Sequence, residues 1–155
     1  MFRCDPIRVD DSQEPSLNIA LHMCLSPESS DKEILDFVEA WIDDLARGDY
    51  EAAYRRTEHD PYYQWTPELI QSVIQGYGSP TPRPGRPVYY VTARSSALGG
   101  PPQRIVDRDT ERPNVLAGVW YDLPLNGEWS DLTATFSVER RDGGAVAVLQ
   151  EIHVF

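Results

Sequence analysis

Apolar and polar positions in the first half of the chain alternate with the period of an α-helix. Between residues 29 and 49, apolar side chains recur at steps of three and four, namely Ile34, Phe37, Val38, Trp41, Ile42 and Leu45. This spacing places them on one face of a helix. Ser30 and Glu33 have the spacing of a capping box, and Gly48 is a stop signal, so the pattern predicts both ends of the helix.

Two more helices are predicted before residue 79. Asp49 can cap a helix over residues 50–58, and Thr66 with Pro67 suits the cap and the first position of a helix that ends by Gly78. The segment 79–87 then holds four prolines. Because proline fixes φ and lacks an N–H donor, this segment is expected to be an extended connector.

The second half of the chain changes to the two-residue period of β-strands. The pattern predicts strands at 88–93, 115–125, 132–140 and 145–155, with one short edge strand inside the loop 98–114. Helices followed by antiparallel strands predict an α+β fold, with three helices packed on one face of a curved antiparallel sheet of about four to six strands. We expect a single domain over 28–155, preceded by an N-terminal extension over 1–27.

The last two strands can be paired from their side-chain pattern. A three-residue loop at Asp142–Gly144 would place Arg141 opposite Ala145 and would bury a continuous apolar face, pairing Leu132 with Val154, Ala134 with Ile152 and Val138 with Val148. The same register places Thr133, Thr135, Glu151 and His153 on the opposite, polar face. Thr133, Glu151 and His153 are therefore a possible polar site on this hairpin. A cross-strand structural role explains them equally.

Composition excludes several classes of function. The chain has 155 residues, with 25 acidic and 14 basic side chains and a net charge of −11. This charge repels phosphate backbones, so no nucleic-acid partner is expected, whereas a basic protein would be attracted. No apolar run approaches the length of a membrane span, and no targeting segment is evident, which predicts a cytoplasmic protein without a membrane partner. Cys4 and Cys24 lack metal-ligand spacing and are expected to be reduced thiols.

Several segments resemble a known superfamily. The ending "GEWSDLTATFSVERRDGGAVAVLQEIHVF" and the stretches "VEAWIDDLARGDYEAAYRRT" and "TPELIQSVIQGYG" resemble an uncharacterised bacterial family. That family belongs to the cone-shaped α+β superfamily of the nuclear transport factors and ketosteroid isomerases. The likeness covers residues 31–78 and 115–155. It implies a cone-shaped fold but no particular chemistry, because enzymes, binding pockets and immunity proteins all use this scaffold.

The leading functional hypothesis is that acidic and aromatic side chains form a surface that binds a protein partner. Its candidate partner-binding residues are Asp36, Glu39 and Asp43 on the first helix, with Tyr62, Tyr63, Trp65 and Trp129 in predicted loops. Acidic side chains attract a basic partner, and Trp and Tyr are enriched in interface hot spots. The sequence thus favours a non-catalytic interaction protein of the immunity type, which binds a toxin or another basic protein.

Two alternatives remain open. The first is a site for a small apolar ligand, or an isomerase site, inside the cone; Asp122 beside Tyr121 is the best available acid for it. The second is a homodimer through the sheet face that carries Ala147, Leu149 and Phe155. His59 and Asp60 are explained by a turn at Asp60-Pro61. No motif for a cofactor, a metal or a catalytic residue is found, so the sequence favours a protein that is not an enzyme.

Overall fold

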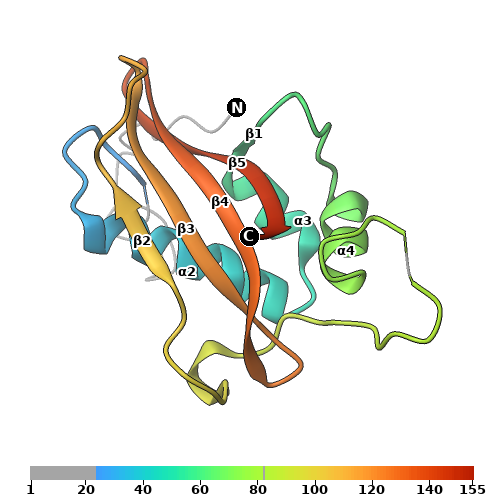
Figure 1. Cartoon of the computed structure of the whole chain (residues 1–155). Coiled ribbons are helices and arrows are strands. Elements are labelled where there is room, and N and C mark those ends of the chain that lie inside the picture. The colour runs from blue at the N-terminus through green and yellow to red at the C-terminus, as the bar shows by residue number, and fades with distance from the viewer. Residues whose placement is uncertain (1–23, 82) are drawn as a thin grey trace, which may run out of the picture.

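The computed structural model describes residues 24–81 and 83–155. This part of the chain contains three helices, a 3-10 turn and five strands, in the order α2 (Asp31–Ala46), α3 (Tyr50–Arg56), β1 (Glu58–His59), α4 (Pro67–Gln75), η1 (Arg94–Ser96), β2 (Arg104–Asp107), β3 (Val115–Leu125), β4 (Glu128–Arg141) and β5 (Gly144–Val154). The strands form one open sheet in the order β1-β5-β4-β3-β2. Helix α2 crosses behind the sheet, and α3 and α4 lie near β5 (Figure 1). The predicted α+β class is confirmed.

The helix ends are set by the residues that the sequence marks. The Ser30 side chain accepts from the Glu33 N–H at 3.1 Å, and the Glu33 carboxylate accepts from the Ser30 N–H at 3.1 Å, which completes the predicted capping box. Gly48, just after α2, has a φ of 74°, a conformation that glycine adopts without strain. Asp49 caps α3 and Thr66 caps α4, as predicted. Local capping thus fixes where all three helices begin.

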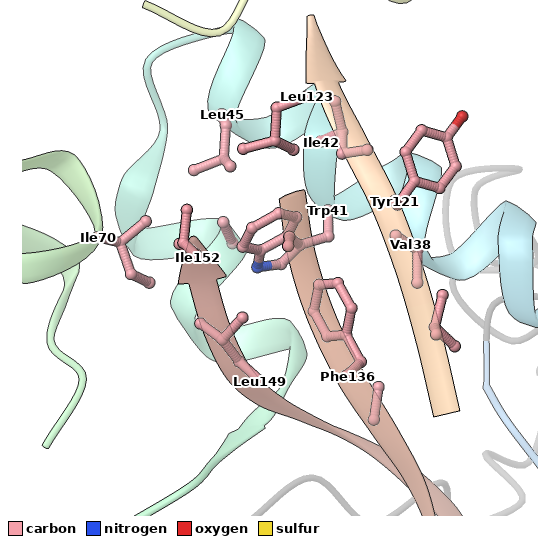
Figure 2. Packing of buried hydrophobic residues seen from close by; sticks show 14 of the residues in the cluster. Val38, Trp41, Ile42, Leu45, Ile70, Tyr121, Leu123, Phe136, Leu149 and Ile152 are labelled. Atoms are coloured by element: carbon pink, nitrogen blue, oxygen red, sulfur yellow. The ribbon is translucent and has the colours of Figure 1, made fainter. Parts of the chain in front are cut away.

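One hydrophobic core joins the helices to the sheet. Trp41 of α2 is fully buried, and its ring meets that of Phe136 edge-on, with centroids 5.0 Å apart. Figure 2 shows Trp41 between the side chains of α2 and those of β4 and β5. Every second residue of β3 from Ala117 to Leu125 is buried against this cluster. Large side chains therefore fill the space between α2 and the sheet.

The sheet differs from the expected one at β1 and at the predicted strand 88–93. β1 has only two residues and runs parallel to β5, so the sheet is mixed rather than wholly antiparallel. The predicted strand at 88–93 is wrong: Val91 makes an isolated bridge to Leu125, and the Asn126 side chain accepts from the Tyr90 N–H at 2.9 Å. Pro124 has no N–H to extend this pairing as a ladder. The predicted edge strand within 98–114 is confirmed as β2.

The β4–β5 hairpin follows the predicted register over only half its length. Leu132 pairs with Val154, Thr133 with His153, Ala134 with Ile152 and Thr135 with Glu151, as predicted. Beyond Thr135 the register shifts by one, so Val138 faces Ala147 and Arg141 faces Gly144, and these two expectations are wrong. Gln150 is the extra residue of a β-bulge, and the turn has two residues. The bulge places Ala147 and Leu149 in the core, which removes them from the sheet face proposed for a homodimer.

The N-terminal region yields one correction. The predicted extension 1–27 lies mostly outside the described residues, which begin at Cys24. Cys24 is disulfide-bonded, so the expectation of a reduced thiol is wrong for this residue, and Cys4 lies outside the described residues. Disulfide formation depends on the distance and orientation of two cysteines in space, which their spacing in the sequence does not reveal. Over the described ranges, no helix combines the length and apolar character needed to cross a bilayer.

The bulge has its own hydrogen-bond partner, which gives a first prediction. The Trp65 indole N–H donates to the Gln150 carbonyl at 3.1 Å, and the Thr135 hydroxyl accepts from the Glu151 N–H at 3.1 Å. Replacing Trp65 by phenylalanine should lower the free energy of unfolding by about 1–3 kcal/mol, because a part-buried carbonyl loses its donor and the site loses volume. Urea unfolding measures this. Trp129→Phe is the control; a loss as large in the control would contradict a special role for the Trp65 bond.

Candidate functional site

An open cleft of about 570 Å³ lies between α2, η1 and the edge of the sheet formed by β2 and β3. Three structural features position its walls: the last turns of α2, the loop that carries η1, and the strand pair on which Arg104 faces Tyr121. The lining residues are Glu39, Asp43, Ala46, Arg47, Ala93, Arg94, Ser95, Pro102, Arg104, Tyr121 and Trp129. The cleft therefore combines five charged side chains with two aromatic rings.

Tyr121 and Glu39 form the innermost polar contact of the cleft. Tyr121 projects from the inner face of β3, with a ring that borders the core and a hydroxyl that points away from it (Figure 2). The hydroxyl donates to Glu39 Oε2 at 2.6 Å. Burial, followed by this bond to a carboxylate, raises the pKa of Tyr121 to about 12, while Arg104 and Arg94 act in the opposite direction. Tyr121 is thus a neutral donor at physiological pH.

Arg94 joins the η1 loop to α2. Its Nε donates to Asp43 Oδ1 at 2.9 Å and its Nη2 donates to Asp43 Oδ2 at 3.0 Å, while Nη1 lies 3.3 Å from Glu39 Oε2. The bond to Asp43 raises the pKa of Arg94 above its ordinary value. Two parallel bonds of this kind fix the guanidinium plane as well as its position. Arg94 therefore neutralises Asp43 and helps to neutralise Glu39.

Two other guanidinium groups at the cleft are less fully engaged. Arg104 of β2 has a side chain that is 49% exposed, and its Nη1 lies 3.6 Å from Glu39 Oε2. Arg47, just beyond α2, has a side chain that is 62% exposed and pairs with Asp44 through Nη2. Each guanidinium carries five N–H donors, so both retain donors that can face the cleft. The carboxylates in the cleft are more fully used than the arginines.

The structure separates the predicted partner-binding residues into three places. Asp36 pairs with Lys32 at 2.7 Å on the exposed side of α2. Glu39, Asp43 and Trp129 line the cleft. Tyr62, Tyr63 and Trp65 lie together in the loop before α4, with ring centroids 4.9 Å apart for the first two and 5.5 Å apart for the last two. The three acids therefore do not form a free acidic stripe, because arginines neutralise two of them.

The proposed polar site on the hairpin is divided among different partners. Thr133 donates to Asp122 Oδ1 at 2.8 Å, and Glu151 accepts from the Tyr63 hydroxyl at 2.9 Å. The ring of exposed His153 packs edge-on against Phe155 at 5.1 Å. Asp122, on the face opposite Tyr121, also accepts from the Gln103 N–H at 2.8 Å. Asp122 is thus directed away from the cleft, and Glu39 is the acid that meets Tyr121.

Sequence reasoning missed Arg94 and Arg104. Both follow the proline-rich connector, in a region without strong periodicity, and the residues that they pair with are 51 or more positions away. One signal was available: Glu39 and Asp43 are like charges four residues apart on a helix, an arrangement that costs energy unless a cation lies nearby. The same repulsion that suggested an external basic partner is relieved by arginines within the chain.

His59 has a structural role. Its ring stacks on Tyr54 with centroids 4.0 Å apart, and its Nε2 lies 2.9 Å from the Tyr54 carbonyl oxygen. Burial lowers the pKa of His59, and the bond to this carbonyl acts in the opposite direction. Asp60 accepts from the Tyr62 N–H at 2.9 Å, as expected for a turn. Within residues 24–81 and 83–155, no group of three or more His, Cys, Asp or Glu side chains has the arrangement of a metal site.

Comparison with known proteins gives no assignment. Neither a family model, nor a curated protein, nor a solved structure matches the chain.

The raised pKa of Tyr121 gives a pH-dependent prediction. The folded state holds the Tyr121 proton more tightly than the unfolded state, so this contribution to stability is complete below pH 10 and is lost as the pH rises to about 12. Tyr121→Phe should therefore show a shallower fall of the unfolding free energy between these pH values than the unsubstituted chain. Chemical denaturation at several pH values, with tyrosinate absorbance, measures it. Tyr62→Phe, at an exposed tyrosine, is the control; identical slopes for all three proteins would contradict the prediction.

Proposed function

We propose that this protein binds a small molecule in the cleft between α2, η1 and β3. The observation that carries the proposal is the convergence of Glu39, Arg94, Arg104 and Tyr121 on one open space of about 570 Å³. Ligand sites are typically a few hundred to about 1,000 Å³ and combine apolar walls with a few fixed polar groups. The bonds among these side chains hold them in place before any ligand arrives, which lowers the entropy cost of binding.

The position of the cleft distinguishes this proposal from a site in the centre of the fold. Trp41, Phe136 and their neighbours occupy the space between α2 and the sheet. The cleft instead lies at the end of this core, where the Tyr121 hydroxyl emerges beside Glu39. This geometry supports binding at the rim and a ligand with polar groups, whereas the sequence analysis considered an apolar ligand in the interior.

A binding experiment with a blocked cleft tests the proposal. Nuclear magnetic resonance of the labelled protein, with a library of small fragments, should show shifts that concentrate on Trp129, Arg94 and Arg104. Ala93→Trp places a large ring on an exposed cleft residue without removing an ion pair and should abolish these shifts. Ser96→Trp, on the same turn but outside the cleft lining, should retain them. Shifts that persist in Ala93→Trp would place binding elsewhere and would contradict the proposal.

Binding of a protein partner is a second candidate, and the exposure of two aromatic side chains favours it. Tyr62 is 82% exposed and Phe155 is 68% exposed. Contacts from Tyr62 to Tyr63, from Tyr63 to Glu151 and from His153 to Phe155 connect the loop before α4 with the end of β5. The net charge of −11 would attract a basic partner, and an immunity-type role is one form of this proposal.

A double variant tests this second candidate. In the native host, Tyr62→Ala with Phe155→Ala should reduce recovery of a stoichiometric complex that weakens with added salt. Val88→Ala with Tyr90→Ala, at two other exposed positions, should leave recovery unchanged. Equal recovery with both double variants would count against an interface at Tyr62 and Phe155.

The superfamily of the protein and its cellular location are also proposals. The order of three helices followed by a bent sheet supports membership of the cone-shaped superfamily that the sequence resembles. The cytoplasmic location remains a prediction, and the disulfide formed by Cys24 weighs against it, because disulfides persist mainly in oxidising compartments. Thiol labelling of the protein in its native host, with and without prior reduction, tests the location. Labelling without reduction would favour the cytoplasm.

A further inference from the structure

In the cleft, most carboxylate oxygens already accept hydrogen bonds, whereas several guanidinium N–H donors are available. This difference indicates which class of ligand binds there. We infer that the ligand is an organic anion, with a carboxylate or phosphate group that pairs with Arg104 and a flat apolar body that packs on Trp129. The inference rests on the proposed function, since it names the class of ligand for that same cleft.

Most carboxylate oxygens of the cleft are already occupied. Both oxygens of Asp43 accept from Arg94, at 2.9 and 3.0 Å. Glu39 Oε2 accepts from the Tyr121 hydroxyl at 2.6 Å and lies 3.3 Å from Arg94 Nη1. Glu39 is also mostly buried, with a side chain that is 15% exposed. Among the contacts of the described residues, Glu39 Oε1 has no hydrogen bond, but three guanidinium groups line the same cleft, so a cationic ligand would meet more like charge than opposite charge.

The donors of the cleft are available. Among the salt bridges of the described residues, Arg104 makes one ion pair, at 3.6 Å to Glu39, and it also has a side-chain hydrogen bond with Tyr121; half of its side chain is exposed. Arg47 is more exposed still, and Ser95 is an exposed residue of the lining. A carboxylate or phosphate has the acceptor geometry that a guanidinium pairs with through two bonds. The guanidinium of Arg104 carries five N–H donors, so an incoming anion can bind those that its contacts with Glu39 and Tyr121 leave free.

The apolar part of the lining determines the rest of the ligand. Trp129 is half-buried, packs against the core and forms one wall of the cleft, with Pro102 and Ala93 among the other apolar residues. A half-buried indole that lines the same cleft as a guanidinium suits a planar ring, which gains from area burial and from stacking. The anionic group then lies at Arg104 and the ring lies at Trp129.

Matched probes with one ring system test the inference. The probes are 2-naphthoate, 2-naphthyl phosphate, the neutral 2-naphthamide and the cationic 2-naphthylmethylammonium, and the readout is the shift of the Trp129 indole N–H signal during titration. We expect the two anions to bind about tenfold or more tightly than the amide, as charge-assisted bonds predict, and the ammonium to bind most weakly. Arg104→Gln should weaken both anions about tenfold and leave the amide unchanged.

Arg108→Gln is the matched control, because Arg108 follows β2, pairs with Asp31 at 2.8 Å and is not part of the cleft lining. It should change the affinity of no probe. If the amide or the ammonium shifts the Trp129 signal at concentrations as low as the anions do, the inference is overturned while the proposed site stands. If none of the four probes shifts that signal, the inference is also overturned, and the fragment experiment with Ala93→Trp then decides the proposed site separately.

Discussion

Replacing Asp44 by alanine should lower the free energy of unfolding by about 3–5 kcal/mol, the range for breaking a buried ion pair from one side. Asp44 is 1% exposed, although it is a charged residue on α2. Its carboxylate accepts from Arg47 and, at 2.5 Å, from Arg56 Nε. Removal of the anion leaves the Arg56 guanidinium, which is 28% exposed, without this partner at the corner between α2 and α3. Urea unfolding measures the change.

Asp36→Ala is the control for this experiment. Asp36 lies on the same helix and pairs with Lys32, but both side chains are at least half exposed. Exposed pairs contribute about 0–1 kcal/mol, so the control should change stability little. Equal losses for the two variants would contradict the conclusion that burial gives the Asp44 contacts their effect.

Trp41→Ala should cost about 3–5 kcal/mol of unfolding free energy, the usual range for deleting a large buried aromatic side chain. Trp41 has no exposed surface, and its ring contacts Phe136 of β4 edge-on. The cavity would open between α2 and the sheet, where most core side chains of both layers meet (Figure 2). Urea unfolding again measures the loss.

Trp41→Phe distinguishes the effect of the lost side-chain volume from the effect of the buried indole N–H. The Trp41 indole N–H is buried and has no hydrogen-bond partner among the residues that the structure describes. Phenylalanine removes this unsatisfied donor, which recovers about 1–3 kcal/mol, but it also leaves a smaller cavity. We therefore expect a loss less than half of that for Trp41→Ala. A loss equal to that of the alanine variant would show that the indole N–H costs little where it lies.

Local signals predicted the helices and the long strands of this fold. Capping residues such as Ser30 and Thr66 act on backbone groups within four positions, so their effect is readable from the sequence. The residues 115–125 form β3 within the expected bounds, because alternation of side chains is also local. β1 was missed since two residues carry no measurable period, and its parallel pairing with β5 joins positions 90 apart.

The composition of the site was predictable only in part. Glu39, Asp43 and Trp129 were identified from the sequence as candidate residues for binding a protein partner, and all three line the cleft. Their grouping with Arg94, Arg104 and Tyr121 depends on tertiary contacts, as does the neutralisation of the two acids. The direction of Tyr121 relative to Asp122 followed from strand alternation, but the acid that Tyr121 meets comes from α2, which no strand pattern reveals.

The extra residue Gln150 lets β5 keep its apolar side chains in the core and also present a carbonyl to the Trp65 indole. Leu149 and Ile152 both point into the core, and they are three positions apart because Gln150 is unpaired. A chain that lacks Gln150 would keep the same faces inward, since Glu151 would follow Leu149 directly, but it would lose the carbonyl that receives the Trp65 indole. A one-residue deletion here should therefore preserve the hairpin and remove one attachment of the loop that carries Tyr62 and Tyr63, while the Tyr63–Glu151 bond remains as another. Protein engineers can use position 150 to alter how that loop is attached while leaving the sheet intact.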